Sequence, residues 1–249
     1  MPSDQHFRSD GHGSLARIGV AISHGFTGSP LSMRAWSDSL AEQGFAVNMP
    51  LLAGHGTSWE DLSRTPWQHW YRDFEAAYLE LANRCDAVFV AGLSMGGALA
   101  LRVAALQPVA GVAVVNPGLT FADKRAPLAP VIKHLVKSFP SIGNDIKAPN
   151  VDEGAYDRTP TAAVHELSKL FKDTISLLPK ITAPTIVFKS DEDHVVPLSS
   201  LEAIKAGIGS SSLEVVPLHN SFHVATMDND AAQIFATSAQ FFREHAHAI

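Results

Sequence analysis

Cysteine is nearly absent from this sequence, because Cys85 is the single one among 249 residues. An intramolecular disulfide is therefore impossible, which is compatible with a reducing compartment. Long apolar runs are also missing, since none approaches the ~20 residues that cross a bilayer. The N-terminal residues lack the basic and then apolar profile of a secretory signal. These absences predict a soluble, cytoplasmic protein.

Positive charge is in short supply as well. The chain has 19 lysines and arginines against 25 acidic residues, which gives a formal net charge of −6. A nucleic-acid partner normally requires a basic face, so we expect none. The 12 histidines show neither the H-E-x-x-H pattern nor the paired Cys/His spacing of zinc sites. We therefore expect no bound metal ion.

Apolar segments of strand length alternate with helical patterns along most of the chain, in which 46% of the residues are hydrophobic. This alternation indicates an α/β protein with a doubly wound, mostly parallel sheet that is covered on both faces. The expected strands are residues 18–22, 45–49, 87–92, 109–116, 185–189 and 213–217. The expected helices are residues 31–43, 66–83, 95–106, 198–206 and 229–245.

The alternation is interrupted between residues 117 and 179, a segment with seven prolines and no clear strand. Four apolar side chains in it have the spacing of one face of a short helix, namely Ile132, Leu135, Val136 and Phe139. A second helix is expected after Thr159, with Pro160 at its first position. We interpret residues 117–179 as a helical cap within a single domain of residues 1–249. Ordinary crossover helices are the alternative interpretation.

The segment Gly92-Leu-Ser-Met-Gly96 matches the pattern G-x-S-x-G. The pattern alone is weak evidence, but here an expected strand precedes it and an expected helix follows it. Such a turn holds its serine in a strained conformation, and side chains at positions 92 and 96 would collide with it. Gly97 would let the helix pack closely on the neighbouring strand. We therefore expect Ser94 to act as a nucleophile.

A serine hydroxyl needs a base that takes its proton and a carboxylate that orients this base. In this chain order the acid follows the serine and the histidine comes last. The loop after residues 185–189 offers three acids, Asp191, Glu192 and Asp193. We favour Asp193, because the apolar residues 195–197 would bury the turn beside it.

Two histidines, His219 and His223, follow the last expected strand. We favour His223 as the base, because Phe222 and Val224 on either side of it would limit its motion and exclude water. His219, at the end of the strand, is interpreted as a loop residue that forms a hydrogen bond. His194, beside the acid, is also interpreted as a loop residue.

Acyl transfer further requires donors for the negative charge on the tetrahedral intermediate. The backbone N–H of Met95, at the start of the helix after the serine, is one candidate for this oxyanion hole. The loop of residues 24–30, with the sequence HGFTGSP, should supply the second. Its candidate donor is the N–H of Phe26, whose ring would line the acyl pocket. A plain strand-to-helix turn is the alternative reading of this loop.

Together, the His24-Gly25-Phe26 loop, the Gly92–Gly96 turn, the Asp193 loop and His223 resemble the α/β-hydrolase superfamily. The spellings GLSMGG and DHVVP, and the Gly-His-Gly of residues 54–56, are similar in particular to bacterial carboxylesterases and monoacylglycerol lipases. This resemblance begins at about residue 18. It implies the α/β-hydrolase fold with a small helical cap inserted after the sixth strand. It also implies that no cofactor is needed and that the cap shapes the acyl pocket.

Within the expected cap, residues 144–156 look like the cap of monoacylglycerol lipases, where an acidic residue can meet the polar head of the substrate. Glu153 would be that residue and would accept hydrogen bonds from a glycerol head. A solvated loop carboxylate is the competing interpretation.

The resulting hypothesis is a serine hydrolase that cleaves monoacylglycerols or short- to medium-chain acyl esters through an acyl-enzyme. Ser94 would attack the carbonyl carbon while His223 takes its proton and Asp193 stabilises the imidazolium. The partner would be a small-molecule ester, with at most transient contact with a lipid interface. A thioesterase or another acyl hydrolase on the same fold, and a non-catalytic ligand-binding protein, are the alternatives.

Overall fold

A computed structural model describes residues 6–123, 129–133, 135–141 and 143–246. In these residues the centre is a seven-stranded sheet with the order β1-β3-β2-β4-β5-β8-β9. Its neighbouring strands are parallel, except that β1 pairs antiparallel with β3 at one edge. The strands are β1 (Phe7–Ser9), β2 (Ile18–Ser23), β3 (Ala46–Met49), β4 (Ala87–Leu93), β5 (Gly111–Val115), β8 (Thr185–Ser190) and β9 (Leu213–Leu218).

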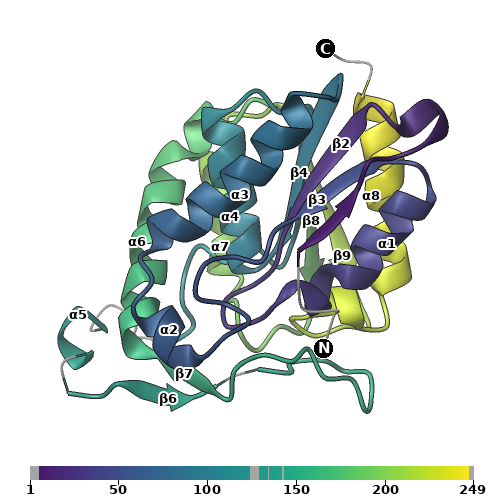
Figure 1. The fold of residues 1–249 in the computed structure, drawn as a ribbon. Coiled ribbons are helices and arrows are strands. Elements are labelled where there is room, and N and C mark those ends of the chain that lie inside the picture. The colour runs from purple at the N-terminus through teal and green to yellow at the C-terminus, as the bar shows by residue number, and fades with distance from the viewer. Residues whose placement is uncertain (1–5, 124–128, 134, 142, 247–249) are drawn as a thin grey trace.

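Helices cover both faces of this sheet (Figure 1). The helices on one face are α3 (Trp67–Ala82), α4 (Met95–Leu106), α6 (Thr161–Leu177) and α7 (Ser199–Gly207). The helices on the other face are α1 (Arg34–Glu42) and α8 (Ala231–His245). This arrangement confirms the predicted doubly wound, mostly parallel sheet. No helix in the described parts of the chain is long and apolar enough to cross a membrane.

A separate apolar core lies on each side of the sheet. The aromatic stripe predicted for α3 faces the first core, where Trp70 and Phe74 are fully buried. In the second core the buried Trp36 of α1 donates a hydrogen bond through its indole N–H to Ser238 of α8, at 2.9 Å. The central strands β4 and β5 between the two cores are apolar along their whole length, as is typical of parallel strands covered on both faces.

The predicted strands and helices outside residues 117–179 are all present within a few residues of their expected bounds. The first turn of the expected helix 31–43 is a short 3-10 helix, Pro30–Met33, which continues into α1. One strand and one α-helix outside residues 117–179 were not predicted, the edge strand β1 and the short helix α2 (Trp59–Ser63), nor were the 3-10 helices Gly13–Leu15 and Ala225–Met227.

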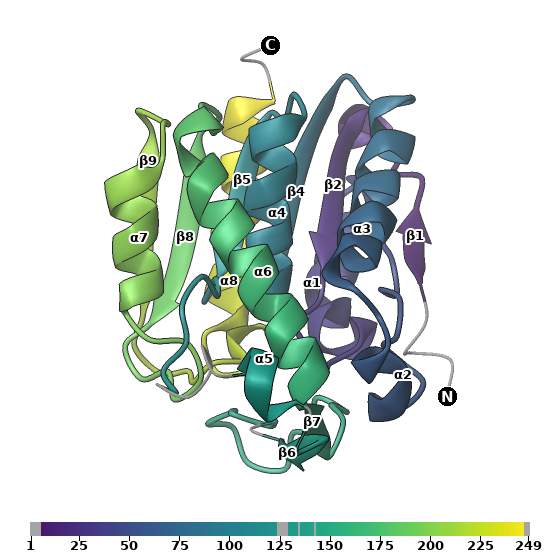
Figure 2. The same ribbon diagram turned by 90° about the vertical axis from the view of Figure 1, so that its left-hand side faces the viewer.

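Residues 117–179, which we call the insertion, connect β5 to β8. Its helix α6 packs against α4 and buries Leu167, Leu170 and Phe171 in the first core, so α6 belongs to the helical layer. Figure 2 shows that α5 (Ala129–Ile132), β6 (Ser138–Pro140) and β7 (Arg158–Pro160) instead lie beyond one end of the sheet. In the described residues five strands precede the insertion, namely the antiparallel β1 and the parallel β2 to β5. The insertion therefore follows the fifth strand rather than the expected sixth.

The predicted helix over residues 132–139 is wrong. Helix α5 ends at Ile132, and Leu135 is 84% exposed, so it does not lie on a buried helix face. Phe139 lies in β6, opposite Thr159 of β7 in a two-stranded antiparallel sheet. Pairing between β6 and β7 supplies hydrogen-bond partners for the backbone groups of Phe139. In addition, the proline that follows Phe139 disfavours the helical conformation at that residue. The helix expected after Thr159 is present, although Pro160 precedes its first residue rather than occupying it.

Candidate active site

The turn between β4 and α4 has the strained geometry that the sequence predicts. Ser94 adopts φ 57° and ψ −117°, a positive φ that is costly for any residue with a side chain. A Cβ atom at position 92 would lie 2.3 Å from the carbonyl oxygen of Gly96, and one at position 96 would lie 2.2 Å from that of Ser23. Such distances are impossible contacts, so glycine is required at both positions. We call residues 92–96 the elbow.

The elbow is attached to the neighbouring strand β5. The N–H of Ser94 donates a hydrogen bond to the carbonyl of Val115, and the carbonyl of Ser94 accepts a hydrogen bond from the N–H of Gly118. Both distances are 3.0 Å. A Cβ atom on Gly97 would lie 2.9 Å from Cβ of Pro117, which agrees with the close packing expected for that glycine. The serine therefore lies at the carboxyl end of the sheet, where functional groups of open α/β sheets gather.

Asp193 and His223 come from the loops after β8 and β9 and lie side by side in the structure. Their side chains are 2% and 8% exposed, and Nδ1 of His223 lies 3.1 Å from Oδ1 of Asp193. This contact lacks the direction of a hydrogen bond, as is common for catalytic contacts without substrate. The same carboxylate oxygen accepts the N–H groups of Val195 and Val196, at 3.0 and 2.8 Å.

Electrostatics keep the Asp193 carboxylate ionised. Burial works to raise its pKa, but His223 and the ammonium group of Lys189 outweigh burial and depress the pKa below its ordinary value. A buried carboxylate that remains charged at neutral pH is suited to orienting an imidazole and to stabilising its protonated form.

The competing acids and histidines lie elsewhere. Asp191 and His219 form an exposed pair at 2.6 Å, and Glu192 is exposed and pairs with Lys147 at 3.3 Å. His194, whose side chain is 56% exposed, pairs with a different carboxylate. Of the candidates on these two loops, the structure therefore brings together Asp193 and His223.

The loop after β2 borders the nucleophile. A Cβ atom on Gly25 would lie 3.6 Å from Cβ of Ser94, so the backbone at Phe26 is close to the serine. Met95 is the first residue of α4, and the first N–H groups of a helix have no acceptor within it. Met95 thus follows Ser94 directly, and Phe26 follows Gly25, the residue whose Cβ position lies beside Ser94. The ring of Phe26 packs on Trp70, with ring centroids 5.9 Å apart.

Two buried histidines support the loop after β2. His24 donates from Nδ1 to the carbonyl of Gly25 at 2.9 Å and accepts the N–H of Leu52 at Nε2, at 3.2 Å. Burial lowers the pKa of His24 to about 4, and burial followed by the charge of His24 also lowers the pKa of His55. Both rings are therefore neutral at pH 7. His24 connects the candidate oxyanion loop to residues 51–56.

Glu153 is buried rather than solvated, so the competing interpretation of this residue is wrong. Its Oε1 accepts the N–H of Asn144 at 2.6 Å, and its own N–H donates to Oδ1 of Asn144 at 2.8 Å. Its Oε2 lies 3.9 Å from where a Cβ of Gly28 would be, beside the candidate oxyanion loop. Burial raises the pKa of Glu153 against smaller opposite effects of Asn144 and His223.

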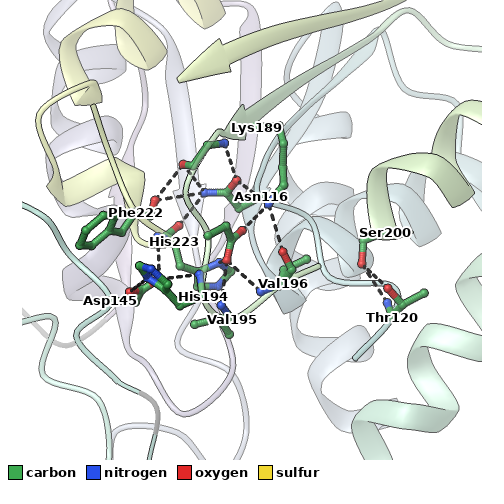
Figure 3. A network of polar contacts seen from close by, with 12 residues as sticks. Asn116, Thr120, Asp145, Lys189, His194, Val195, Val196, Ser200, Phe222 and His223 are labelled. Carbon is green, nitrogen blue, oxygen red and sulfur yellow. Dashed lines mark hydrogen bonds and ion pairs between the residues drawn. The ribbon is translucent and has the colours of Figure 1, made fainter. Parts of the chain in front are cut away.

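Three polar residues around the pair of Asp193 and His223 were missed by the sequence reasoning (Figure 3). Asn116 donates from Nδ2 to the carbonyl of His223 at 2.8 Å. Asp145 accepts the backbone N–H of His223 at 3.1 Å and contacts Nδ1 of His194 at 2.7 Å. Lys189 binds the carboxylate of Asp193. Asn116 and Lys189 carried a readable signal, because each is a polar residue at the carboxyl end of an apolar strand.

No group of three or more histidine, cysteine or acidic side chains in the described residues is arranged to hold a metal ion.

Known proteins resemble this chain over most of its length. A thermostable monoacylglycerol lipase of Bacillus sp. (strain H-257) is 42% identical over 230 residues, which are 92% of each chain. A carboxylesterase of Bacillus subtilis (strain 168) is 23% identical over 85% of this chain and 86% of its own.

Solved structures agree with these relatives. One, from a study of LipS and LipT, two metagenome-derived lipolytic enzymes, has a TM-score of 0.93 at 39% identity and covers 98% of this chain and 99% of its own. The monoacylglycerol lipase of Paleococcus ferrophilus has a TM-score of 0.79 at 15% identity over 96% of this chain and 98% of its own, a likeness of fold alone. The α/β-hydrolase fold is thereby confirmed.

A family model described as serine aminopeptidase, S33, matches residues 16–230. That match includes the elbow, the Asp193 loop and the loop of His223. The chain therefore belongs to the S33 serine aminopeptidase family, with the α/β-hydrolase fold.

Proposed function

We propose that this chain is a serine hydrolase that cleaves carboxylic esters, with monoacylglycerols or short- to medium-chain acyl esters as its substrates. The observation that carries the proposal is Ser94, held at a φ of 57° by two glycines that tolerate no side chain. The names of the two Bacillus relatives, a monoacylglycerol lipase and a carboxylesterase, support the substrate class.

The proposed reaction has two steps that share one base. Oγ of Ser94 attacks the ester carbonyl carbon while Nε2 of His223 takes the hydroxyl proton, and the C–O bond to the alcohol then breaks as His223 returns that proton to the leaving oxygen. Water activated by the same histidine next attacks the acyl-enzyme and releases the acid. Since Nδ1 of His223 faces Asp193, the carboxylate stabilises the imidazolium that forms in each step.

The N–H groups of Phe26 and Met95 form the proposed oxyanion hole. Each intermediate places a negative charge on the former carbonyl oxygen, and a fixed backbone donor in such a site contributes about 3–4 kcal/mol to the barrier reduction. The Met95 donor also has the positive end of the α4 dipole behind it. The buried, neutral His24 fixes the other side of the hole.

We propose that residues 117–179 form a cap within a single hydrolase domain. The support comes from contacts between the insertion and loops around Ser94. Tyr156 donates its N–H to the carbonyl of Thr27 at 3.1 Å and its hydroxyl to that of Gly54 at 2.9 Å. Asp145 in turn accepts the backbone N–H of His223 at 3.1 Å. A cap held this close to the nucleophile would limit access by bulky triacylglycerols.

Glu153 is the proposed acceptor for the glycerol head of a monoacylglycerol. One carboxylate oxygen is occupied by the N–H of Asn144. The other lies 3.9 Å from where a Cβ of Gly28 would be, in the candidate oxyanion loop, and is suited to accept a hydrogen bond from a hydroxyl group of the substrate.

The substrate class is tested with p-nitrophenyl esters of increasing acyl length beside 1- and 2-monoacylglycerols. We expect a burst of the chromogenic alcohol that Ser94→Ala abolishes. Equal slow release in the wild type and this variant would leave a non-catalytic ligand-binding protein as the better account.

The head-group role is tested with Glu153→Ala on a glyceryl monoester and an ethyl ester of one acid. We expect turnover of the glyceryl ester to fall more, because the ethyl ester lacks the hydroxyl groups that Glu153 would bind. Asp152→Ala, an exposed neighbour, is the matched control. An equal loss on both esters contradicts the role.

A cytoplasmic location and at most transient contact with a lipid interface complete the proposal. Cell fractionation tests the location, and co-sedimentation with vesicles of zwitterionic lipid tests the contact. Stable recovery with the vesicles would contradict the second part.

A further inference from the structure

Lys189 is a buried cation in direct contact with the candidate catalytic acid. Its side chain is 10% exposed, and Nζ binds Oδ2 of Asp193, whose side chain is 2% exposed. Nζ also donates to the carbonyl of Val196 at 3.2 Å and to Oδ1 of Asn116 at 3.4 Å. The three donors of the ammonium group therefore all have acceptors, which fixes its position (Figure 3).

The two oxygens of the Asp193 carboxylate thus serve different partners. Oδ1 faces His223 and accepts two backbone N–H groups, whereas Oδ2 is held by Lys189. The carboxylate and the ammonium together carry no net charge. When His223 takes the proton of the nucleophile, its positive charge forms beside a neutral pair rather than beside an uncompensated carboxylate. A cation at this place makes protonation of the imidazole less favourable.

We propose that Lys189 is a positioning residue that fixes the Asp193 carboxylate and, through its charge, keeps His223 neutral down to a lower pH than Asp193 alone would allow. This inference rests on the proposed function, because it assumes that His223 is the catalytic base. The consequence for the enzyme is activity that extends further into the acid range.

Other ionisable groups around His223 act in both directions. Carboxylates favour its protonation, and cations oppose it. These groups are Glu153, Asp145 and Lys147 from the insertion, His194 from the loop of Asp193, and Asp228 from the loop after His223. Lys147 pairs with Glu192 and His194 with Asp145, so each of these cations has a carboxylate of its own. Lys189 is the cation that binds the carboxylate of Asp193 itself.

The test compares the pH dependence of kcat/KM for a p-nitrophenyl ester in four proteins. They are the wild type, Lys189→Gln, Lys189→Arg and Lys205→Met, the last being an exposed lysine on α7 that serves as the control. Glutamine keeps a hydrogen-bond donor for Asp193 but removes the charge, and arginine keeps the charge. The acid limb of this profile reports the ionisation of the free base.

We expect the acid limb to move to higher pH by about one unit in Lys189→Gln. Loss of one nearby, partly screened charge typically produces a shift of this size. Activity on the acid side of the limb then falls about tenfold relative to the wild type. In Lys189→Arg and Lys205→Met the limb stays where it is in the wild type. Should Lys189→Gln fail to fold, Lys189→Met serves as the second uncharged variant. An NMR titration of the His223 ring in the Ser94→Ala background reads the same shift without catalysis.

An acid limb that stays in place in Lys189→Gln, even with a reduced kcat, overturns the proposal and leaves Lys189 a structural residue. Asp193→Asn and His223→Gln separate this outcome from a failure of the proposed function. Wild-type activity in those two variants would contradict the catalytic assignment. Inactive Asp193→Asn and His223→Gln beside an unmoved limb contradict the role of Lys189 alone.

Discussion

The elbow differs in what fixes its conformation from the outer part of the insertion, which comprises α5, β6, β7 and the described residues that connect them. In the elbow, carbonyl oxygens within 2.3 Å of the missing Cβ positions leave glycine as the residue that fits at 92 and 96. In the outer insertion, β6 and β7 are strands of three residues each, and Leu135 is 84% exposed. What holds this part in place is a few long-range contacts, such as that of Tyr156 with Gly54 and that of Asp145 with His223. Steric requirements between neighbouring residues can be predicted from a sequence, whereas long-range hydrogen bonds of this kind cannot.

The largest effect should come from breaking the elbow. Gly96→Ala places a Cβ atom 2.2 Å from a backbone oxygen of β2, and neither backbone has room to move. We expect a loss of more than ~4 kcal/mol in the free energy of unfolding, or no folded protein at all. Urea titration followed by circular dichroism measures this. Gly28→Ala is the control, because the nearest atom to its missing Cβ lies at an ordinary contact distance of 3.6 Å and its φ is not positive. Equal stability of both variants would contradict the steric account.

A second comparison lies within the insertion itself. Leu170→Ala in α6 removes a fully buried side chain from the first core and should cost about 2–5 kcal/mol of unfolding free energy. Leu135→Ser in the outer part should change it by no more than ~0.5 kcal/mol, because that side chain is already in water. Thermal and urea unfolding of both variants measure the difference. Similar costs would mean that the two parts of the insertion are equally well packed.

The smallest effect concerns the anchor at Glu153. Burial raises its pKa in the folded protein above the ordinary 4.5, so the folded state binds this proton more tightly than the unfolded chain does. Protonation of Glu153 therefore stabilises the folded state fully below pH ~4.5, and this stabilisation is lost as the pH rises through the raised pKa. Glu153→Gln keeps an acceptor for Asn144 and does not titrate.

The stability of Glu153→Gln relative to the wild type should accordingly increase between pH 4.5 and neutrality. Urea unfolding at a series of pH values measures this difference, with Asp152→Asn as the control. A difference that is constant with pH would show that burial does not perturb this carboxyl group.

The sequence predicted the sheet and the elbow because their signals are local. An apolar run, a glycine two positions before the serine and a helical pattern after it need no distant residue to be interpreted. It also favoured Asp193 over Asp191 on the strength of the apolar residues that follow it. The helix expected through Phe139 was wrong because β7, about twenty residues further on, offered that segment a strand partner.

Lys189 could not have been assigned from the sequence for a related reason. A lysine at the end of an apolar strand is expected to reach water, and it is buried here because Asp193, Val196 and Asn116 converge on its ammonium group. Asp193 and Val196 follow Lys189 by four and seven residues, whereas Asn116 comes from the end of β5, 73 residues away in the chain. The polar character of the residue was visible, but its partners were not.

The central claim is that Ser94 is the nucleophile, and covalent labelling tests it most directly. The protein is incubated with diethyl p-nitrophenyl phosphate, released nitrophenol is measured, and the labelled peptide is identified by mass spectrometry. We predict stoichiometric release, a phosphoryl group on the peptide that contains Ser94, and neither in Ser94→Ala. Labelling of a different residue, or unchanged release from Ser94→Ala, would contradict the account.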